Sequence, residues 1–259
     1  MLQSPKPLDT PWLRRGFLLL NLAMPVLVIA LGWHWWMAGT AVLVHGSFIY
    51  GLVAPSSGIF GPVVTHFVTE KKELWLTIDD GPDGENSLEL ARELARREVR
   101  ATFFVIGERL EKQAETARAV MALGHTLANH TQTHPVMSFW ALLPWALRDE
   151  VVRGNERLAR TGVQVGRWFR APFGLKHIHL HSLLSALEMR LVAWNIRGHD
   201  GLICDVEKVV ERVVTQARPG SIILLHEGRP KSNRTILRVI EELQNRGYSF
   251  VIPADDQLR

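Results

Sequence analysis

Short apolar runs alternate with longer amphipathic stretches from residue 73 to the C-terminus. A short apolar run bounded by turn residues predicts a buried strand, and apolar residues three and four apart predict a helix. Strand–helix alternation of this kind indicates an α/β fold with a parallel sheet, with enough repeats to close into a distorted TIM-like (β/α)7 barrel. The predicted strands are Leu74–Ile78, Ala101–Ile106, Thr126–Asn129, Arg167–Phe169, Leu191–Trp194, Ser221–Leu225 and Ser249–Ile252, and the predicted helices are Ser87–Arg97, Leu110–Leu123, Phe139–Arg160, His179–Leu187, Val206–Ala217 and Thr235–Arg246.

The N-terminal part has a different pattern, because residues 16–69 contain no Asp, Glu, Lys or Arg. A spanning helix needs about 20 apolar residues, so this stretch has room for two. Phe17–Trp36 is the stronger candidate and Ala38–Val53 the weaker, since His45, Gly46 and Ser47 interrupt it. We therefore expect a basic segment 1–15, a membrane anchor of one or two transmembrane helices at 16–54, with a transmembrane hairpin favoured, a linker 55–71 and a catalytic domain 72–259. Aromatic residues near the proposed span ends fit interfacial anchors: Trp12, Trp33, Trp35, Trp36 and Tyr50.

Two alternatives to a membrane hairpin are a buried core hairpin and a cleaved signal peptide. A signal peptide would begin with the basic residues Arg14 and Arg15, but no convincing small-residue cleavage site follows the apolar stretch. Basic residues flank the apolar stretch on both sides, which favours both ends of a hairpin on the cytoplasmic face of the inner membrane. If the second stretch does not cross, the remaining chain is periplasmic or extracellular.

Charge and cysteine content exclude some functions. The formal net charge is +4, divided evenly between the apolar N-terminal part and a nearly balanced remainder. No basic stripe is visible, so nucleic acid is not an expected partner. The chain has one cysteine, Cys204, which excludes an internal disulfide and a thiolate metal cluster.

Polar clusters follow most of the predicted strands. Asp79 and Asp80 follow the first, His130–His134 the third and Arg170–Gly174 the fourth, while Asp200 trails the fifth and His226 closes the sixth. In parallel barrels the chemistry lies where strands end and loops begin, so these clusters are expected on one rim. Taken alone, an Asp pair of this kind is more often a solvated turn than a functional site.

The types of residue on this rim predict a metal centre. Histidines four apart present both rings on one face of a helical turn, and with Asp80 they form a two-histidine, one-carboxylate set. That set suits Zn²⁺, or another divalent transition ion, with a bound water. Neighbours on an extended backbone point in opposite directions, so Asp79 is free to act as a base. A structural His-x-x-x-His pair is the alternative.

Three further residues complete the predicted chemistry. His226 could donate a proton to a leaving nitrogen, although a lone histidine at a strand end is more often part of the core. Arg170 can hold Asp79 ionised and oriented. Asp200 can in turn hold Arg170.

The motifs TIDDGP at 77–82, HTQTH at 130–134, RAPFG at 170–174 and LLH ending at 226 together resemble the polysaccharide deacetylase family (carbohydrate esterase family 4, the NodB-homology domain) over about residues 72–259. The resemblance is to a membrane-anchored bacterial member. It implies a distorted barrel and metal-dependent removal of an N-acetyl group from an amino sugar. By matching positions it implies Asp79 as base, His226 as acid, metal ligands at Asp80, His130 and His134, and tuning of the acid–base pair by Arg170 and Asp200.

The same resemblance implies that the Phe173 backbone N–H is an oxyanion donor and that Leu224 lines the acetyl pocket. One departure stands out, because the family usually has Trp where this chain has Gly201. Trp194 could fill part of the space, and the substrate wall on the acid side is expected to differ.

Two more features invite interpretation. His177, His179 and His181 could form a second metal site, but we expect exposed loop or helix-start histidines. The apolar segment Phe139–Trp145 follows the metal ligands. It is expected either to pack in the core or to form a membrane-facing lip that admits a lipid-linked sugar.

The expected partners are thus an N-acetylated sugar and the lipid bilayer, and the oligomeric state stays open. A cytoplasmic barrel would favour a lipid-linked sugar, and an external one peptidoglycan or an exported polysaccharide. The alternatives are a deformylase, a hydrolase of a small non-sugar amide, and a non-catalytic glycan-binding or assembly protein.

Overall fold

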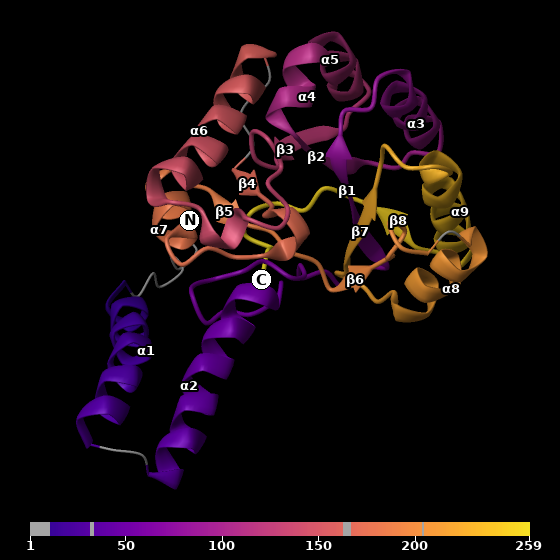
Figure 1. The fold of residues 1–259 in the computed structure, drawn as a ribbon. Helices are drawn as coiled ribbons and strands as arrows, with labels where there is room; N and C mark the ends of the chain where they lie inside the picture. The colour runs from indigo at the N-terminus through magenta and orange to yellow at the C-terminus, as the bar shows by residue number, and fades with distance from the viewer. Residues whose placement is uncertain (1–10, 32–33, 163–166, 204) are drawn as a thin grey trace.

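A curled parallel sheet wrapped by helices forms the body of the protein, and two helices project from it (Figure 1). The computed structural model describes residues 11–31, 34–162, 167–203 and 205–259; Cys204, Trp33 and the first ten residues lie outside this part. The strands are β1 (Glu73–Gly81), β2 (Ala101–Val105), β3 (Thr126–Asn129), β4 (Trp168–Phe169), β5 (Arg190–Leu191), β6 (Ile196–Arg197), β7 (Ile222–His226) and β8 (Ser249–Phe250). The helices around them are α3 (Glu85–Arg96), α4 (Gly107–Lys112), α5 (Ala114–Ala122), α6 (Pro144–Arg160), α7 (Leu180–Ala186), α8 (Val206–Gln216) and α9 (Ser232–Asn245).

The sheet has the order β5-β4-β3-β2-β1-β7-β6, with β8 pairing only with the start of β1. Every strand pair is parallel. The outermost strands, β5 and β6, have no ladder between them in the described chain, so the barrel is curled but open. The α/β class and the parallel sheet are confirmed, whereas a closed barrel is not. The N-terminal segment lies along β5, where Val64 forms a bridge with Val192.

Alternation along β1 explains how the strand serves two layers. Leu74, Leu76 and Ile78 pack into the cluster beneath the outer helices. Trp75 packs on the opposite, inner side, and Thr77 and Asp79 follow it at the same two-residue period. The inner face of β1 is therefore apolar at its start and polar at its C-terminal end. This places the chemistry at the rim of the sheet.

Several predicted elements differ from the observed ones. The predicted strand Leu191–Trp194 is wrong: the chain forms the two short strands β5 and β6. The predicted helix Leu110–Leu123 is divided at Gln113, which has a non-helical backbone (φ −134°, ψ 37°) and accepts a hydrogen bond from the Gly84 amide. Phe139–Arg160 is also divided, into a 3-10 turn η1 (Phe139–Ala141) and α6, because Pro144 begins the helix at its first turn.

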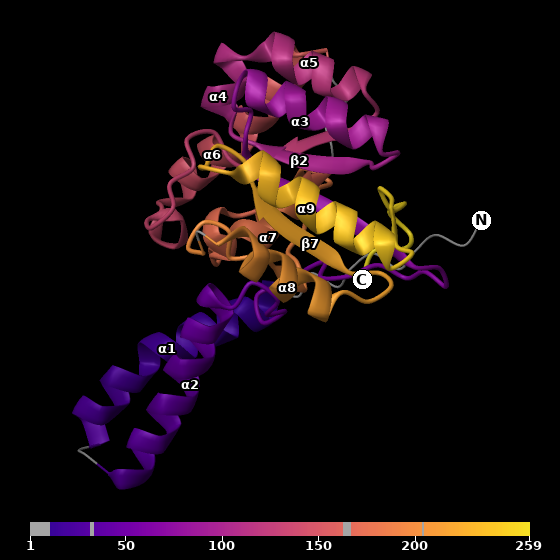
Figure 2. The ribbon, with the colours of Figure 1, turned by 90° about the vertical axis from the view of Figure 1, so that its right-hand side faces the viewer.

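The two N-terminal helices, α1 (Pro11–Leu31) and α2 (Trp35–Val53), lie side by side as a hairpin that projects away from the barrel (Figure 2). By length and composition α2 could cross a membrane, whereas the apolar part of α1 is shorter, Leu18–Ala30. Part of the predicted span Phe17–Trp36 lies outside the described residues, so the ranking of the two stretches stays a prediction. Met24 and Met37 are buried, while most large apolar side chains of the hairpin face outward. The exposed ones include Leu19, Leu22, Val26, Ile29, Trp35, Trp36, Val42, Leu43, Ile49 and Tyr50.

The end of α2 is fixed to the barrel. The rings of Phe48 and Phe60 are 5.5 Å apart, and the Lys176 amide donates to the Leu52 carbonyl at 2.8 Å. The Lys176 ammonium donates to the Ala54 carbonyl. The segment 55–71 then packs along the barrel through buried residues: Phe60, Val64 and Phe67. The hairpin therefore leaves the barrel beside the loop that carries residues 172–174.

Candidate metal centre

The two carboxylates at the end of β1 face the same space. The strand continues through Asp79 and Asp80 to Gly81, but Asp80 has a left-handed backbone (φ 75°) at an irregularity in the β1–β2 register. This interrupts the alternation that would have turned the two side chains apart. His130 Nε2 lies 3.7 Å from an oxygen of Asp79 and 3.6 Å from one of Asp80. The prediction that the two acids point to opposite sides is therefore wrong.

The His130–His134 segment is a loop and not the predicted helical turn. Thr131 and His134 both have positive φ, 70° and 60°. The Thr131 amide donates to the Asn129 side chain, and the His134 amide donates to the Thr131 hydroxyl at 3.0 Å. Glu150 of α6 accepts from the amides of residues 132 and 133, which ties the loop to the helix. The centres of the His130 and His134 rings lie 4.7 Å apart. The loop therefore brings the two imidazoles together, as the predicted helical turn was expected to do.

Asp80, His130 and His134 form a candidate ligand set for a divalent metal. One ligand atom from each lies within 4.8 Å of the others, and His134 Nε2 is 3.3 Å from Asp80 Oδ1. His130 Nδ1 lies 2.8 Å from the Arg170 carbonyl, which can only accept, so this nitrogen carries a proton and Nε2 is the nitrogen left to bind a metal. Two imidazoles and one carboxylate leave coordination positions open, as in catalytic zinc sites.

The pKa shifts favour the forms that bind a cation. Burial alone raises the pKa of Asp80, but the hydrogen bond and charge of His130, with the charges of His226 and His134, outweigh it and hold the pKa below its usual range. Burial and the neighbouring His130 lower the pKa of His134 to about 4, against the opposing pull of Asp80 and Asp79. At neutral pH the set therefore offers an ionised carboxylate and a neutral imidazole.

Arg170 holds Asp79 as the sequence predicted. Its side chain is fully buried, and Nη1 donates to Asp79 Oδ1 at 2.7 Å and to the Thr77 hydroxyl at 2.8 Å. The guanidinium also donates to the carbonyls of Val192 and Ala193 and lies over the Phe104 ring at 4.0 Å. A buried charge with this many partners fixes the carboxylate in one position.

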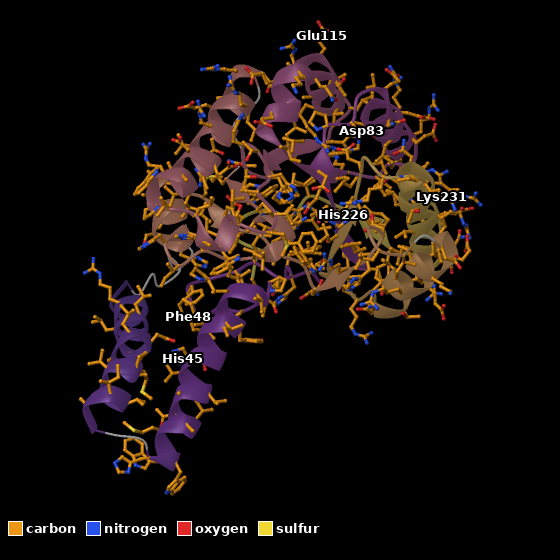
Figure 3. All side chains as sticks on the ribbon, viewed as in Figure 1. His45, Phe48, Asp83, Glu115, His226 and Lys231 are labelled. Atoms are coloured by element: carbon orange, nitrogen blue, oxygen red, sulfur yellow. The ribbon has the colours of Figure 1, made fainter. Side chains whose placement is uncertain are left out.

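Asp200 does not hold Arg170, contrary to the prediction. One oxygen of Asp200 lies 2.8 Å from His226 Nδ1, and the other accepts from the His226 amide at 2.7 Å. Asp200 lies in the loop after β6 and His226 at the end of the adjacent strand β7, so the loop meets the histidine and not the arginine. Figure 3 shows the labelled His226 over the middle of the barrel. Asp200 therefore orients His226 and leaves Nε2 free to face the cavity.

One cavity is lined by Asp79, Asp80, His130, His134 and His226. The predicted pocket residues Phe173, Leu224 and Trp194 line it as well. Phe173 has a left-handed backbone (φ 57°) in the turn η2 (Pro172–Gly174), and Leu224 is buried on β7. The cavity also contains residues that the sequence interpretation missed, because no motif marked them: Ile106, Arg109, Val136, Arg197 and Arg229.

The missing tryptophan at Gly201 has a structural counterpart in this cavity. The guanidinium carbon of Arg229 lies 3.4 Å from the place where a Cβ on residue 201 would be. A tryptophan there would compete with the arginine for space. Arg229 in turn reaches Asp80 Oδ2 at 3.2 Å. The glycine therefore accommodates a cation beside the candidate metal ligands.

The three alternating histidines and the apolar segment Phe139–Trp145 each contain both buried and exposed residues. His177 and His181 are buried and His179 is exposed, so the expectation of exposed histidines is wrong for two of the three. His177 Nε2 contacts the Leu142 carbonyl at 2.8 Å. In the apolar segment Phe139 is buried in the core, whereas Trp140 and Trp145 are exposed.

Comparison with known proteins agrees with the motifs. The family model described as polysaccharide deacetylase matches residues 67–192. A chitooligosaccharide deacetylase of Bradyrhizobium sp. is 33% identical, over 72% of this chain and 86% of that protein. A peptidoglycan-N-acetylglucosamine deacetylase of Bacillus cereus is 29% identical, over 70% and 66% of the two chains.

The fold is also similar to solved structures of this group. One is a mutant of a Bacillus anthracis pseudoenzyme of carbohydrate esterase family 4 with restored enzymatic activity. It has a TM-score of 0.67 and 25% identity over 73% of this chain and 68% of that one. The chain therefore belongs to the polysaccharide deacetylase family and is a hydrolase of carbon–nitrogen bonds other than peptide bonds.

Proposed function

We propose that the chain is a metal-dependent N-deacetylase that hydrolyses the acetamido group of an N-acetylated amino sugar. The observation that carries this function is the convergence of a metal ligand set, a carboxylate and a histidine on one cavity. The relatives that act on chitooligosaccharides and on peptidoglycan N-acetylglucosamine support an amino sugar as the substrate. The test is release of acetate from an N-acetylglucosamine oligosaccharide by the metal-loaded protein.

The chain's own groups would divide the reaction as follows. Asp80, His130 and His134 would hold a divalent metal such as Zn²⁺, which would acidify a water and polarise the acetamido carbonyl. Asp79, held in place by Arg170, accepts the proton that the attacking water loses. The Phe173 amide donates to the developing oxyanion, and Leu224 and Trp194 enclose the acetyl group. His226 Nε2 donates a proton to the leaving nitrogen as the C–N bond breaks, giving acetate and a free amine.

The Asp200–His226 pair predicts a change in pH dependence. Burial lowers the pKa of His226, but the hydrogen bond and charge of Asp200, with the charges of Asp79 and Asp80, raise it above the ordinary value. A raised pKa keeps the acid form populated to higher pH. Asp200→Asn removes that charge, so the fall of kcat/KM on the alkaline side should move to lower pH. If the alkaline fall of kcat/KM occurs at the same pH in Asp200→Asn as in the wild type, His226 is not the general acid.

We further propose that the hairpin anchors the enzyme in the inner membrane, with the barrel on the cytoplasmic side and a lipid-linked sugar as its substrate. The outward-facing apolar side chains of α1 and α2 support the anchor. So does an exposed apolar patch at the start of α6, at the end of the barrel from which the hairpin extends (Figure 1). We call this patch the lip; it consists of Met137, Trp140, Leu143 and Trp145, which are 47–77% exposed.

The lip gives a test of membrane contact. Replacing Trp140 and Trp145 by Ser should reduce activity on a lipid-linked amino sugar in vesicles by about tenfold, since partial burial of two large side chains is worth more than ~1.4 kcal/mol. Activity on a soluble oligosaccharide should change by less than about twofold. Val68→Ser, an exposed apolar residue outside the lip, is the matched control. Equal losses on both substrates would exclude the lip.

Two other functions use similar machinery. A deformylase would release formate from a formamido sugar. The assay for released acetate also detects formate and distinguishes the two products. The pseudoenzyme among the similar structures makes a non-catalytic glycan-binding role the alternative from a different class. That role predicts no release of either acid.

A further inference from the structure

Three arginines line the catalytic cavity, and the buried Arg170 contacts Asp79 without lining it. Arg109 comes from α4, after β2; Arg197 is the last residue of β6; and Arg229 lies in the loop after β7. They therefore approach from separate parts of the rim. The three arginines differ in the number of acceptors that their guanidinium groups contact within the described chain.

The guanidinium of Arg197 contacts aromatic rings and no hydrogen-bond acceptor among the described residues. Its guanidinium lies 5.4 Å from the centre of the Phe173 ring and 5.6 Å from that of Trp194, which hold it in the cavity wall. Its Nε is buried and donates to no acceptor in the described residues. None of the ion pairs among those residues includes its guanidinium. An arginine stacked on aromatic rings keeps its planar fork of donors oriented for a ligand.

Arg109 and Arg229 both contact Asp80. Arg109 Nη1 donates to the Asp80 carbonyl at 2.6 Å, and Arg229 Nη2 donates to its carboxylate at 3.2 Å. Asp80 carries one negative charge, and Asp79 is already balanced by Arg170. Among the arginines and carboxylates that line the cavity, three arginines face this one charge, an excess of two positive charges before any divalent metal adds two more.

A neutral acetamido sugar offers no partner for such an excess. A phosphate group does, because it accepts two parallel hydrogen bonds from a guanidinium and carries full negative charge. A cavity lined by one sign of charge also concentrates ligands of the opposite sign. The excess charge therefore points to a substrate that carries an anion close to its acetamido sugar.

We propose that the cavity binds a phosphate group on the amino-sugar substrate, with Arg197 as the direct contact and Arg109 and Arg229 contributing the positive potential. The inference rests on the proposed deacetylase function and names its substrate class, a sugar phosphate or phosphodiester. The place of the site agrees with a lipid phosphodiester. The Arg197 guanidinium lies over the ring of Phe173, and Phe173 precedes Gly174. A Cβ added to Gly174 would lie 2.7 Å from Pro55, two residues after the end of α2.

The test compares N-acetylglucosamine 1-phosphate with N-acetylglucosamine on the zinc-loaded full chain. The wild type should prefer the phosphate, and Arg197→Gln should lower the ratio of the two kcat/KM values by about 10- to 100-fold, as for a charged hydrogen bond. Arg118→Gln, an exposed arginine on α5, should leave the ratio unchanged. An unchanged ratio in Arg197→Gln, or no preference in the wild type, overturns the proposal.

Equilibrium binding separates this proposal from the proposed function. In the zinc-loaded Asp79→Asn protein, N-acetylglucosamine 1-phosphate should bind at least tenfold more tightly than N-acetylglucosamine, and adding Arg197→Gln should remove that difference. This preference without any turnover by the wild type would uphold the phosphate site and reject the deacetylase. Equal gains from N-acetylmuramic acid, a carboxylate, would overturn phosphate recognition. A prenyl phosphodiester of the sugar that binds more tightly still would identify the lipid as the source.

Discussion

Asp79→Asn should lower kcat by about 10²- to 10⁴-fold, the usual contribution of a general base. The amide cannot accept the proton that the attacking water loses, whereas the candidate metal ligands Asp80, His130 and His134 are untouched. Zinc content should therefore stay at the wild-type level while acetate release falls. The measurement is single-turnover acetate release together with metal analysis of the same sample.

The same substitution also affects stability, because the Asp79 carboxylate forms an ion pair with a fully buried arginine. Removing the charge from one side of a buried pair costs about 3–5 kcal/mol when the partner is left uncompensated. An asparagine still accepts the hydrogen bond from Arg170, so the loss should lie below that range. Unfolding by denaturant distinguishes an inactive folded variant from an unfolded one. A folded Asp79→Asn protein with wild-type turnover would contradict the assignment of the base.

His134→Ala should lose both metal and activity. It removes one of three ligands, which leaves two to bind the ion. The transition-state stabilisation supplied by a Lewis acid is several kcal/mol, so we expect acetate release to fall by a factor on the order of 10³. His179→Ala, an exposed histidine outside the cavity, is the matched control. Full zinc binding by His134→Ala would exclude it as a ligand.

Much of the fold could be predicted from the sequence because the hydrophobic pattern depends on residues close together in the chain. Alternation of apolar strands and amphipathic helices depends on residues a few positions apart, and it placed β1, β2, β3, β7 and most of the helices. The polar clusters could be assigned to one rim because parallel strands end at the same edge. Short strands were harder, since β5 and β6 are two residues each and depend on neighbours far away in the chain.

The candidate site shows where sequence interpretation stops. Asp200 was assigned to the wrong partner because spacing along the chain says nothing about which strand its loop approaches. The positive φ values at Asp80 and Thr131 are unusual for these residues, so the convergence of the ligands could not be inferred from regular geometry. Arg197 and Arg229 have no motif, and only the fold places them in the cavity.

The central claim is that a metal held by Asp80, His130 and His134 makes this chain a deacetylase. The direct measurement is acetate release from chitotetraose by the full-length protein before chelation, after removal of metal, and after addition of one equivalent of Zn²⁺. We expect release before chelation, none from the metal-free protein, and recovery with zinc at one ion per chain. Acetate release that persists without metal, or that never occurs with any divalent ion bound, would contradict the account.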